Sequence, residues 1–177
     1  MTQNIAIRPA EASDAGALAA FGEKTFLATF GHLYPPKDKA YFISLRYSLE
    51  RTLQDIADPT RWLVVAYEGA ELVGFLDCCQ LGLPLPQPEA GALEISRLYL
   101  DESQKGTGLA QKLMEMALEW ARAKGAPAIY LGVWSQNERA KRFYAKFGFE
   151  IVGAYHFKVG KTLDDERIMR LSLTSAD

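Results

Sequence analysis

The sequence is poor in residues that form disulfides or bind metals. It contains two cysteines and two histidines in 177 residues. Cys78 and Cys79 are adjacent in an expected strand, where neighbouring side chains point to opposite faces, so we expect no structural disulfide between them. His32 and His156 are far apart in the sequence and form no ligand pair with each other. We therefore expect a protein that contains no bound metal.

Long apolar runs and an excess of charge are also missing. No run approaches the length of a membrane span, and the first residues lack the basic and apolar regions of a secretory signal. The net charge is −2 and the pI is about 5.8, which argues against a surface for nucleic acid or anionic membranes. The composition is ordinary for a globular protein. We expect a cytoplasmic protein with a single domain spanning residues 1–177.

The hydrophobic pattern predicts an α/β chain, with proline and glycine residues at the element ends. Apolar and β-branched runs predict strands at residues 5–8, 62–67, 72–81, 92–100, 128–133, 149–157 and 167–173. Helical spacing predicts helices at about 14–30, 38–57, 108–124 and 137–147. A stiff proline-rich loop at 83–88 connects the third and fourth strands.

A loop rich in small residues follows the fourth strand and opens directly into a helix. Gly106 and Gly108 lie in this loop, where a missing side chain leaves backbone N–H groups accessible. The helix start adds unpaired N–H groups and the positive end of the helix dipole, a combination that binds phosphate. The loop lacks the Lys-Ser/Thr ending of a Walker loop, and Gln111 occupies the third glycine position of a dinucleotide fingerprint. A phosphate cradle and a plain glycine turn both fit this loop alone.

Two segments resemble the GNAT acetyltransferase superfamily. Residues 105–110, Lys-Gly-Thr-Gly-Leu-Ala, are similar to its pyrophosphate loop, Gln/Arg-x-x-Gly-x-Gly/Ala. Lys105 departs from that pattern, since it provides charge without the planar fork of arginine. Residues 137–149 are similar to the family stretch Asn-x-x-Ala-x-x-Phe-Tyr-x-x-x-Gly-Phe. The likeness extends over nearly the whole chain and is strongest from Glu94 to Leu173.

The resemblance implies a fold and a site for acetyl-CoA. The fold would be a mixed, mostly antiparallel sheet with splayed central strands, flanked by helices. Acetyl-CoA would lie between the strands at 94–100 and 128–133, and an N–H group, that of Leu98, would polarise the thioester carbonyl. Asn137 and Tyr144, two helical turns apart, would share one face toward the pantetheine. The full set of implied cofactor-binding residues is Leu98, Tyr99, Leu100, Lys105, Gly106, Thr107, Gly108, Leu109, Ala110, Gln111, Asn137 and Tyr144.

The implied reaction is direct acetyl transfer to a primary amine. An alkylammonium must first lose a proton, and Glu94 is the expected base, acting directly or through water. The other glutamate position of the family corresponds to Gly132, which has no side chain for this task. Tyr144 is the expected acid for the departing thiolate. The structural alternatives are a surface carboxylate for Glu94, a helix-start residue for Asn137 and core packing for Tyr144.

The acceptor is less constrained by the sequence. The segment that contains Phe26, Phe30, Tyr34 and Tyr41 is rich in aromatic residues. These side chains either line a pocket for the acceptor or pack in the core. The carboxylates Asp77, Glu89, Glu94 and those at 164–166 favour a cationic acceptor, or are solvated.

The segments 94–100, 131–134 and 153–170 resemble a bacterial subgroup that includes spermidine/spermine N-acetyltransferases. We therefore expect a polyamine or a related small amine as acceptor. A protein N-terminus or lysine, an amino-sugar antibiotic and a non-catalytic acyl-CoA-binding module are the alternatives. Pairing through strand edges into a homodimer is also expected from the resemblance.

Overall fold

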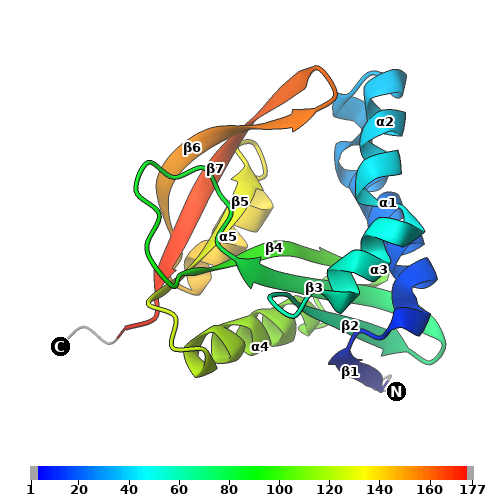
Figure 1. Ribbon diagram of the computed structural model, residues 1–177. Coiled ribbons are helices and arrows are strands. Elements are labelled where there is room, and N and C mark those ends of the chain that lie inside the picture. The colour runs from blue at the N-terminus through cyan, green and yellow to red at the C-terminus, as the bar shows by residue number, and fades with distance from the viewer. Residues whose placement is uncertain (1–3, 175–177) are drawn as a thin grey trace. The chain divides into compact units, whose positions relative to one another are not determined.

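The computed structural model describes residues 4–174 as an alternation of strands and helices (Figure 1). The strands are β1 (Ile5–Pro9), β2 (Trp62–Glu68), β3 (Glu71–Gln80), β4 (Leu93–Leu100), β5 (Ala128–Trp134), β6 (Glu150–Val159) and β7 (Thr162–Ser172). The helices are α1 (Ala15–Phe30), α2 (Pro36–Arg46), α3 (Leu49–Ala57), α4 (Leu109–Ala123) and α5 (Glu138–Lys146). Short 3₁₀ turns lie at Ala12–Asp14, Gly31–Leu33 and Glu102–Gln104.

The strands form one mixed sheet in the order β1-β2-β3-β4-β5-β7-β6. Strand β5 pairs antiparallel with β7, and β1 pairs antiparallel with β2. Strand β4 pairs parallel with β5, with Leu93 opposite Ile129 and Ile95 opposite Leu131. The predicted α/β class, a mixed sheet flanked by helices, is confirmed.

The chain divides into two compact units. The first contains residues 1–77, 97–113 and 159–162, and the second contains residues 78–96, 114–158 and 163–177. In the first unit, α3 contacts both α1 and β2 (Figure 1). Its core is formed by side chains of α1 and of strands β2 and β3, namely Leu18, Phe21, Leu63, Val65 and Phe75.

The second unit holds β5, α5 and most of β6 and β7. One of its apolar clusters consists of Ala92, Ala128, Tyr130 and Ile168. Leu81, Leu83, Leu85 and Tyr155 pack against this cluster, so the loop after β3 is attached to the sheet by its leucines. This loop contains the predicted proline-rich segment.

Two element boundaries differ from the prediction. The helix expected over 38–57 is two helices, because Tyr47 leaves the helical path with ψ near 21° and Ser48 starts α3. The Ser48 Oγ accepts a hydrogen bond from the Arg51 N–H at 3.1 Å. The last strand begins at Thr162 rather than at 167. Its acidic residues 164–166 therefore lie in a strand, and Asp164 is buried.

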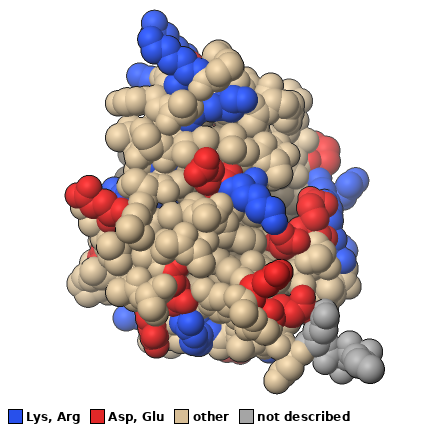
Figure 2. All heavy atoms as spheres, turned by 90° about the vertical axis from the view of Figure 1, so that its right-hand side faces the viewer, with Lys and Arg blue, Asp and Glu red and all other residues tan. Residues whose placement is uncertain are grey.

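Acidic and basic side chains lie interspersed among uncharged ones on the face shown in Figure 2, in keeping with the small net charge. Within residues 4–174, no helix is long and apolar enough to cross a membrane. The same range holds no group of three histidine, cysteine, aspartate or glutamate side chains arranged to bind a metal ion. Cys78 and Cys79 are both thiols.

Candidate active site

The small-residue loop of the first unit contains two glycines in the left-handed region of backbone conformation. Gly106 and Gly108 have φ angles of 80° and 88°, a region in which residues with a side chain are strained. A Cβ at either position would meet nothing within 4 Å, so the glycines are required by conformation and the space beside them is open. The Thr107 hydroxyl donates to the Gln104 carbonyl at 2.9 Å. This bond ties the loop to the preceding turn immediately before α4 begins.

The charged side chains around this loop form local ion pairs. Lys105 pairs with Glu102, and Lys24 pairs with Asp101 at 2.8 Å. The hydrogen bond from Lys24, aided by one from the Ser103 N–H, lowers the pKa of Asp101 to about 2. A shallow pocket lies beside this pair, lined by Lys24, Thr25, Ala28, Thr29, Leu100, Asp101 and Glu102. The Lys105 ammonium is exposed, so its pairing with Glu102 is a weak, solvent-screened one.

The end of β4 holds the predicted pantetheine-binding stretch, Leu98–Leu100. The Tyr99 ring packs edge-on against Phe75 with ring centroids 5.4 Å apart, so the side chain belongs to the core of the first unit. The Asp101 N–H donates to the Val73 carbonyl at 2.9 Å, which ties the end of β4 to β3. The ladder with β5 extends over Leu93–Ile95, and the predicted stretch lies beyond it.

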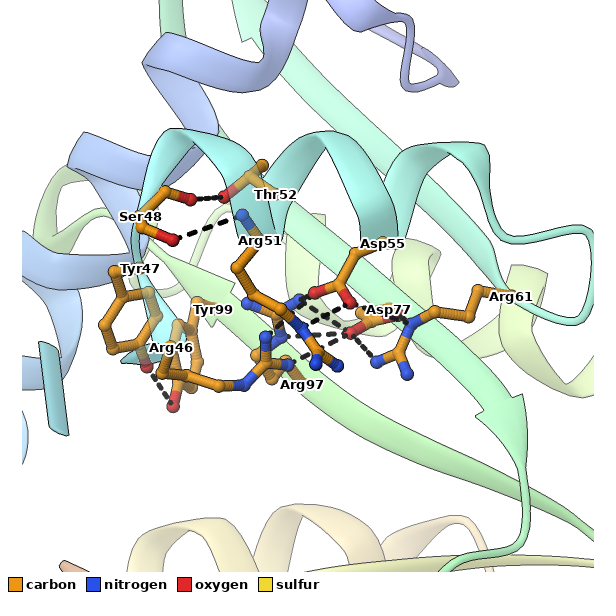
Figure 3. Close-up of polar contacts among 10 residues, drawn as sticks. All are labelled: Arg46, Tyr47, Ser48, Arg51, Thr52, Asp55, Arg61, Asp77, Arg97 and Tyr99. Carbon is orange, nitrogen blue, oxygen red and sulfur yellow. Dashed lines mark hydrogen bonds and ion pairs between the residues drawn. The ribbon is translucent and has the colours of Figure 1, made fainter. Parts of the chain in front are cut away.

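A buried ionic cluster fixes this strand to α3 and β3 (Figure 3). Asp77 is fully buried and accepts hydrogen bonds from Arg61 at 2.7 Å and from Arg97 at 2.8 Å. Asp55 accepts from Arg97 at 3.1 Å and from Arg46 at 2.8 Å. Burial raises the pKa of Asp55, but the hydrogen bond and charge of Arg46, with the other arginines, bring it below its ordinary value. The sequence predicts that Asp77 either favours a cationic acceptor or is solvated, whereas its buried carboxylate accepts hydrogen bonds from arginines.

The three aromatic residues predicted at the acceptor site lie in or near an aromatic cluster of the first unit. Phe26 and Tyr34 are buried and stack with ring centroids 5.7 Å apart. Phe30 is half-buried, with its ring 5.7 Å from that of Phe26. Phe42 and Tyr47 pack on Phe26 as well. This burial favours the core-packing interpretation for Phe26 and Tyr34; their contact with an acceptor stays a prediction.

Helix α5 of the second unit positions Asn137 and Tyr144. The Asn137 side chain accepts a hydrogen bond from the Ala140 N–H at 3.1 Å and caps the helix, as the structural alternative anticipated. The Tyr144 ring is half-buried and meets Phe143 and Phe149 edge-on. Gly148 ends the helix with φ of 93°. Tyr144 therefore lies in the last turn of α5, and its ring packs against aromatic neighbours.

The predicted base, Glu94, is half-buried at the start of β4. Its Oε2 accepts a hydrogen bond from the Gly82 N–H at 2.9 Å. Glu94 is opposite Tyr130 in the β4–β5 ladder, so the two side chains lie on the same face of the sheet. Tyr130 donates to Glu89 at 2.9 Å, and Arg170 donates to the same carboxylate. Glu89 is thus paired with Arg170, whereas Glu94 is held by the Gly82 N–H.

Glu166, from the acidic run that the sequence linked to a cationic acceptor or to solvent, and Tyr155, which sequence reasoning gave no role, complete this face. Tyr155 of β6 donates a hydrogen bond to Glu166 of β7. A Cβ at Gly132 would overlap the Tyr155 hydroxyl oxygen, so the phenol occupies the space that a side chain at 132 would fill. The sequence contained one usable signal, the lack of a side chain at 132, but the partner that fills the space comes from another strand.

Comparisons with known proteins show which family the chain resembles. The model of the Acetyltransferase (GNAT) family matches residues 25–149. An uncharacterized N-acetyltransferase of Mycobacterium bovis is 33% identical over 157 residues, which cover 89% of this chain and 96% of that protein. The spermine/spermidine N(1)-acetyltransferase of Bacillus subtilis is 31% identical over 105 residues, covering 56% of this chain and 66% of that protein.

A solved structure shares the fold at lower identity. The crystal structure of PaiA N-acetyltransferase from Thermoplasma acidophilum, in complex with coenzyme A, has a TM-score of 0.75 and 22% identity. The match covers 96% of this chain and 99% of that one. Together with the family match over residues 25–149, these similarities identify the protein as a member of the GNAT family of N-acetyltransferases.

Proposed function

We propose that the protein transfers the acetyl group of acetyl-CoA directly to a primary amine of a small cationic acceptor, with a polyamine or related diamine as first candidate. The observation that supports this acceptor class most strongly is the acidic face of the second unit, where Glu94 and Glu166 flank Tyr155. Two carboxylates on one face attract an alkylammonium. The likeness to the spermine/spermidine acetyltransferase of Bacillus subtilis points to the same class.

Several features of the first unit support an acetyl-CoA site. The open, positive-φ glycines 106 and 108 and the start of α4 suit the pyrophosphate, which the amides of residues 106–111 hold. Lys105 adds charge once it exchanges its surface partner Glu102 for a phosphate. The backbone of Leu98, Tyr99 and Leu100 pairs with the pantetheine, and the Leu98 N–H polarises the thioester carbonyl. The amide nitrogen of Asn137 retains donors for the pantetheine, since only its oxygen is used in capping.

The reaction then proceeds in one step of acyl transfer. The unprotonated amine nitrogen forms a bond to the acetyl carbon, and the bond from this carbon to sulfur breaks. Tyr144 donates its phenolic proton to the departing thiolate and recovers a proton from the former amine. Before the attack, a carboxylate of the acidic face takes one proton from the acceptor's ammonium group. Glu94, held by the Gly82 N–H, binds the ammonium group and is one of the two carboxylates near enough to Tyr155 to influence it.

The test is a thiol-release assay with acetyl-CoA and a panel of polyamines, diamines, amino acids, peptides and aminoglycosides. We expect release with polyamines or diamines, accompanied by the acetylated amine in mass spectra. Release only with peptides would support a protein N-terminus or lysine as acceptor. Acetyl-CoA binding without release from any acceptor would favour a binding module and overturn the proposal.

A further inference from the structure

Register in the second unit brings Glu94, Gly132 and Glu166 to one face of the sheet. On β5, residues 130, 132 and 134 point to the same side because side chains alternate along a strand. Their partners are Glu94 opposite Tyr130, Ile168 opposite Gly132 and Glu166 opposite Trp134. Cross-strand partners share a face. Glu94 and Glu166 therefore lie on the same side of the sheet, on either side of the gap left by Gly132.

The Tyr155 phenol fills that gap. It comes from β6, and its hydroxyl lies where a Cβ of Gly132 would be. Tyr155 also packs against the apolar cluster of Ala92, Ala128, Tyr130 and Ile168, beside the leucines of the loop after β3. Burial, followed by the charges of Glu166 and Glu94, raises the pKa of Tyr155 well above its usual value. The phenol therefore stays protonated and serves as a fixed hydrogen-bond donor to Glu166.

Glu166 lies in a partly dehydrated, acidic environment. It is half-buried, and so are Tyr155 and Glu94, which leaves part of each side chain in reach of a ligand. Burial, then the charge of Asp164, and to a smaller extent that of Asp165, raise the pKa of Glu166 to about 7, although the hydrogen bond from Tyr155 opposes this. Asp165 is itself paired with Arg167 at 2.6 Å and lies near His156. Trp134, opposite Glu166 on β5, contributes no charge.

We propose that Glu166 is the base that removes the proton from the acceptor's ammonium group, and that Tyr155 is the residue that positions it. This inference rests on the proposed amine acetylation. In the step, one N–H bond of the ammonium breaks, its electron pair stays on nitrogen, and the proton moves to a carboxylate oxygen of Glu166. Glu94, whose oxygen accepts a hydrogen bond from the Gly82 N–H, binds the cationic acceptor. Solvent later removes the proton from Glu166, so that the net proton release of amine acetylation balances.

The division of roles follows from what each carboxylate requires. A base working near neutral pH performs best when its own pKa lies close to that pH, which the surroundings of Glu166 provide. A carboxylate that stays in place binds a cation well, and the Gly82 N–H holds the Glu94 carboxylate at 2.9 Å. The phenol between them donates its hydrogen bond to Glu166 and stays protonated. The acidic run at 164–166 is therefore a functional element of β7.

The experiment is the pH dependence of kcat/KM with spermidine or the best acceptor found, for wild type, Glu166→Gln, Tyr155→Phe and Glu94→Gln. Wild type should lose activity as the pH falls below about 7. At pH 7, kcat/KM of Glu166→Gln should be roughly 100-fold lower than that of wild type. This difference should shrink about tenfold for each unit by which the pH is raised, because more of the amine is then unprotonated and needs no base. With trifluoroethylamine, a weakly basic amine already unprotonated at pH 8, Glu166→Gln should match wild type.

The remaining variants separate positioning and binding from proton removal. Tyr155→Phe should shift the acid limb of the pH profile, the loss of kcat/KM below about pH 7, and should lower kcat with little change in KM. Glu94→Gln should raise KM and leave the acid limb of the profile unchanged. Glu150→Gln, which removes an exposed carboxylate of β6, is the matched control and should follow wild type. Acetyl-CoA affinity and thermal unfolding show that each variant is folded.

The outcomes separate the two proposals. Turnover by wild type with an unchanged acid limb in Glu166→Gln would overturn the role of Glu166 and leave amine acetylation intact. Loss of the limb in Glu94→Gln alone would assign the base to Glu94. Absence of turnover with any amine, while acetyl-CoA still binds, would overturn amine acetylation together with the role of Glu166.

Discussion

Arg97 donates two hydrogen bonds to the fully buried Asp77, from Nε at 3.0 Å and from Nη2 at 2.8 Å. The next residue, Leu98, begins the backbone stretch proposed to bind the thioester. The ion pair thus holds the strand in place immediately before this stretch. It also links β3 and β4 to α3 through Asp55, which accepts from the same guanidinium at 3.1 Å (Figure 3).

Loss of the buried charge at this cluster should destabilise the first unit. Asp77→Asn leaves Arg61 and Arg97 without full compensation, and we expect a decrease of about 3–5 kcal/mol in the free energy of unfolding. The matched control is Asp165→Asn, which removes a half-exposed carboxylate paired with Arg167 and should cost less than about 1 kcal/mol. Urea unfolding measures both. Similar effects of the two substitutions would show that the buried cluster is not a stabilising anchor.

Removal of the Tyr144 hydroxyl should slow turnover without weakening acetyl-CoA binding. Tyr144→Phe retains the ring contacts with Phe143 and Phe149 but loses the proton for the thiolate, so kcat should fall by roughly 100-fold or more. The acetyl-CoA Kd should stay within about twofold, since the ring is kept. Tyr67→Phe, which removes a hydroxyl bonded to Asp14, serves as control. A Tyr144→Phe variant with wild-type kcat would remove Tyr144 as the acid.

A side chain at Gly108 should weaken acetyl-CoA binding. The φ of 88° is costly for alanine, by about 1–2 kcal/mol, while the space is open. The loop is expected to relax its backbone and lose the orientation of its amides, and Gly108→Ala should raise the acetyl-CoA Kd about tenfold. Gly16→Ala is the control, because Gly16 lies in α1 with an open Cβ position. Calorimetric titration with equal Kd values for both variants would contradict a phosphate role for the loop.

Gly132→Ala should disturb the Tyr155–Glu166 pair. The added Cβ overlaps the phenol oxygen of Tyr155. Displacing the phenol should lower the free energy of unfolding by about 1–3 kcal/mol and should remove most of the activity. Combining it with Tyr155→Phe should restore part of the stability, because the overlapping oxygen is gone. Gly153→Ala is the control, since a Cβ there meets Ile168 at an ordinary 3.7 Å. If Gly132→Ala and Gly153→Ala have equal melting temperatures and activities, the proposed packing at Gly132 is wrong.

Acid should remove the stabilisation provided by Asp14. The hydrogen bond from Arg8 lowers the pKa of this carboxyl to about 2 from an ordinary value of 3.8. The ionised, paired form therefore stabilises the fold above about pH 4, and this contribution is lost as the pH falls through 2. Wild type should exceed Asp14→Asn by about 2 kcal/mol in unfolding free energy at pH 7, with the difference disappearing near pH 2. A constant difference over this range would exclude the linkage.

Much of the fold could be predicted from the sequence because its signals are local. The strand, glycine loop and amphipathic helix at 92–124 follow from alternation, positive-φ glycines and helical spacing, and the structure has β4 and α4 there. A helix was likewise predicted at 137–147, and the structure has α5 there. The break between α2 and α3 was missed because Tyr47 and Ser48 include neither proline nor glycine. The break reflects tertiary packing, in which the Tyr47 ring lies directly against Gly22.

The candidate site residues that the sequence suggested together are those that lie close to one another along the chain. The loop at 105–110 and the pair Asn137 and Tyr144 each lie within one segment. Glu166 and Tyr155 come from two strands and meet only through the register of β5, β6 and β7. The acidic run at 164–166 has the composition of a solvated turn, and only its place in β7 shows that part of it is buried. Pairing across strands is the information that composition and spacing do not contain.

The most direct test of amine acetylation at the acidic face compares wild type with the double variant Glu94→Gln/Glu166→Gln. Acetylated spermidine is measured by mass spectrometry at pH 7, and acetyl-CoA affinity is measured in parallel. We predict product from wild type, at least roughly 100-fold less from the double variant, and the same acetyl-CoA Kd for both. Equal product from both proteins, or acetyl-CoA binding without product from wild type over the whole amine panel, would contradict the account.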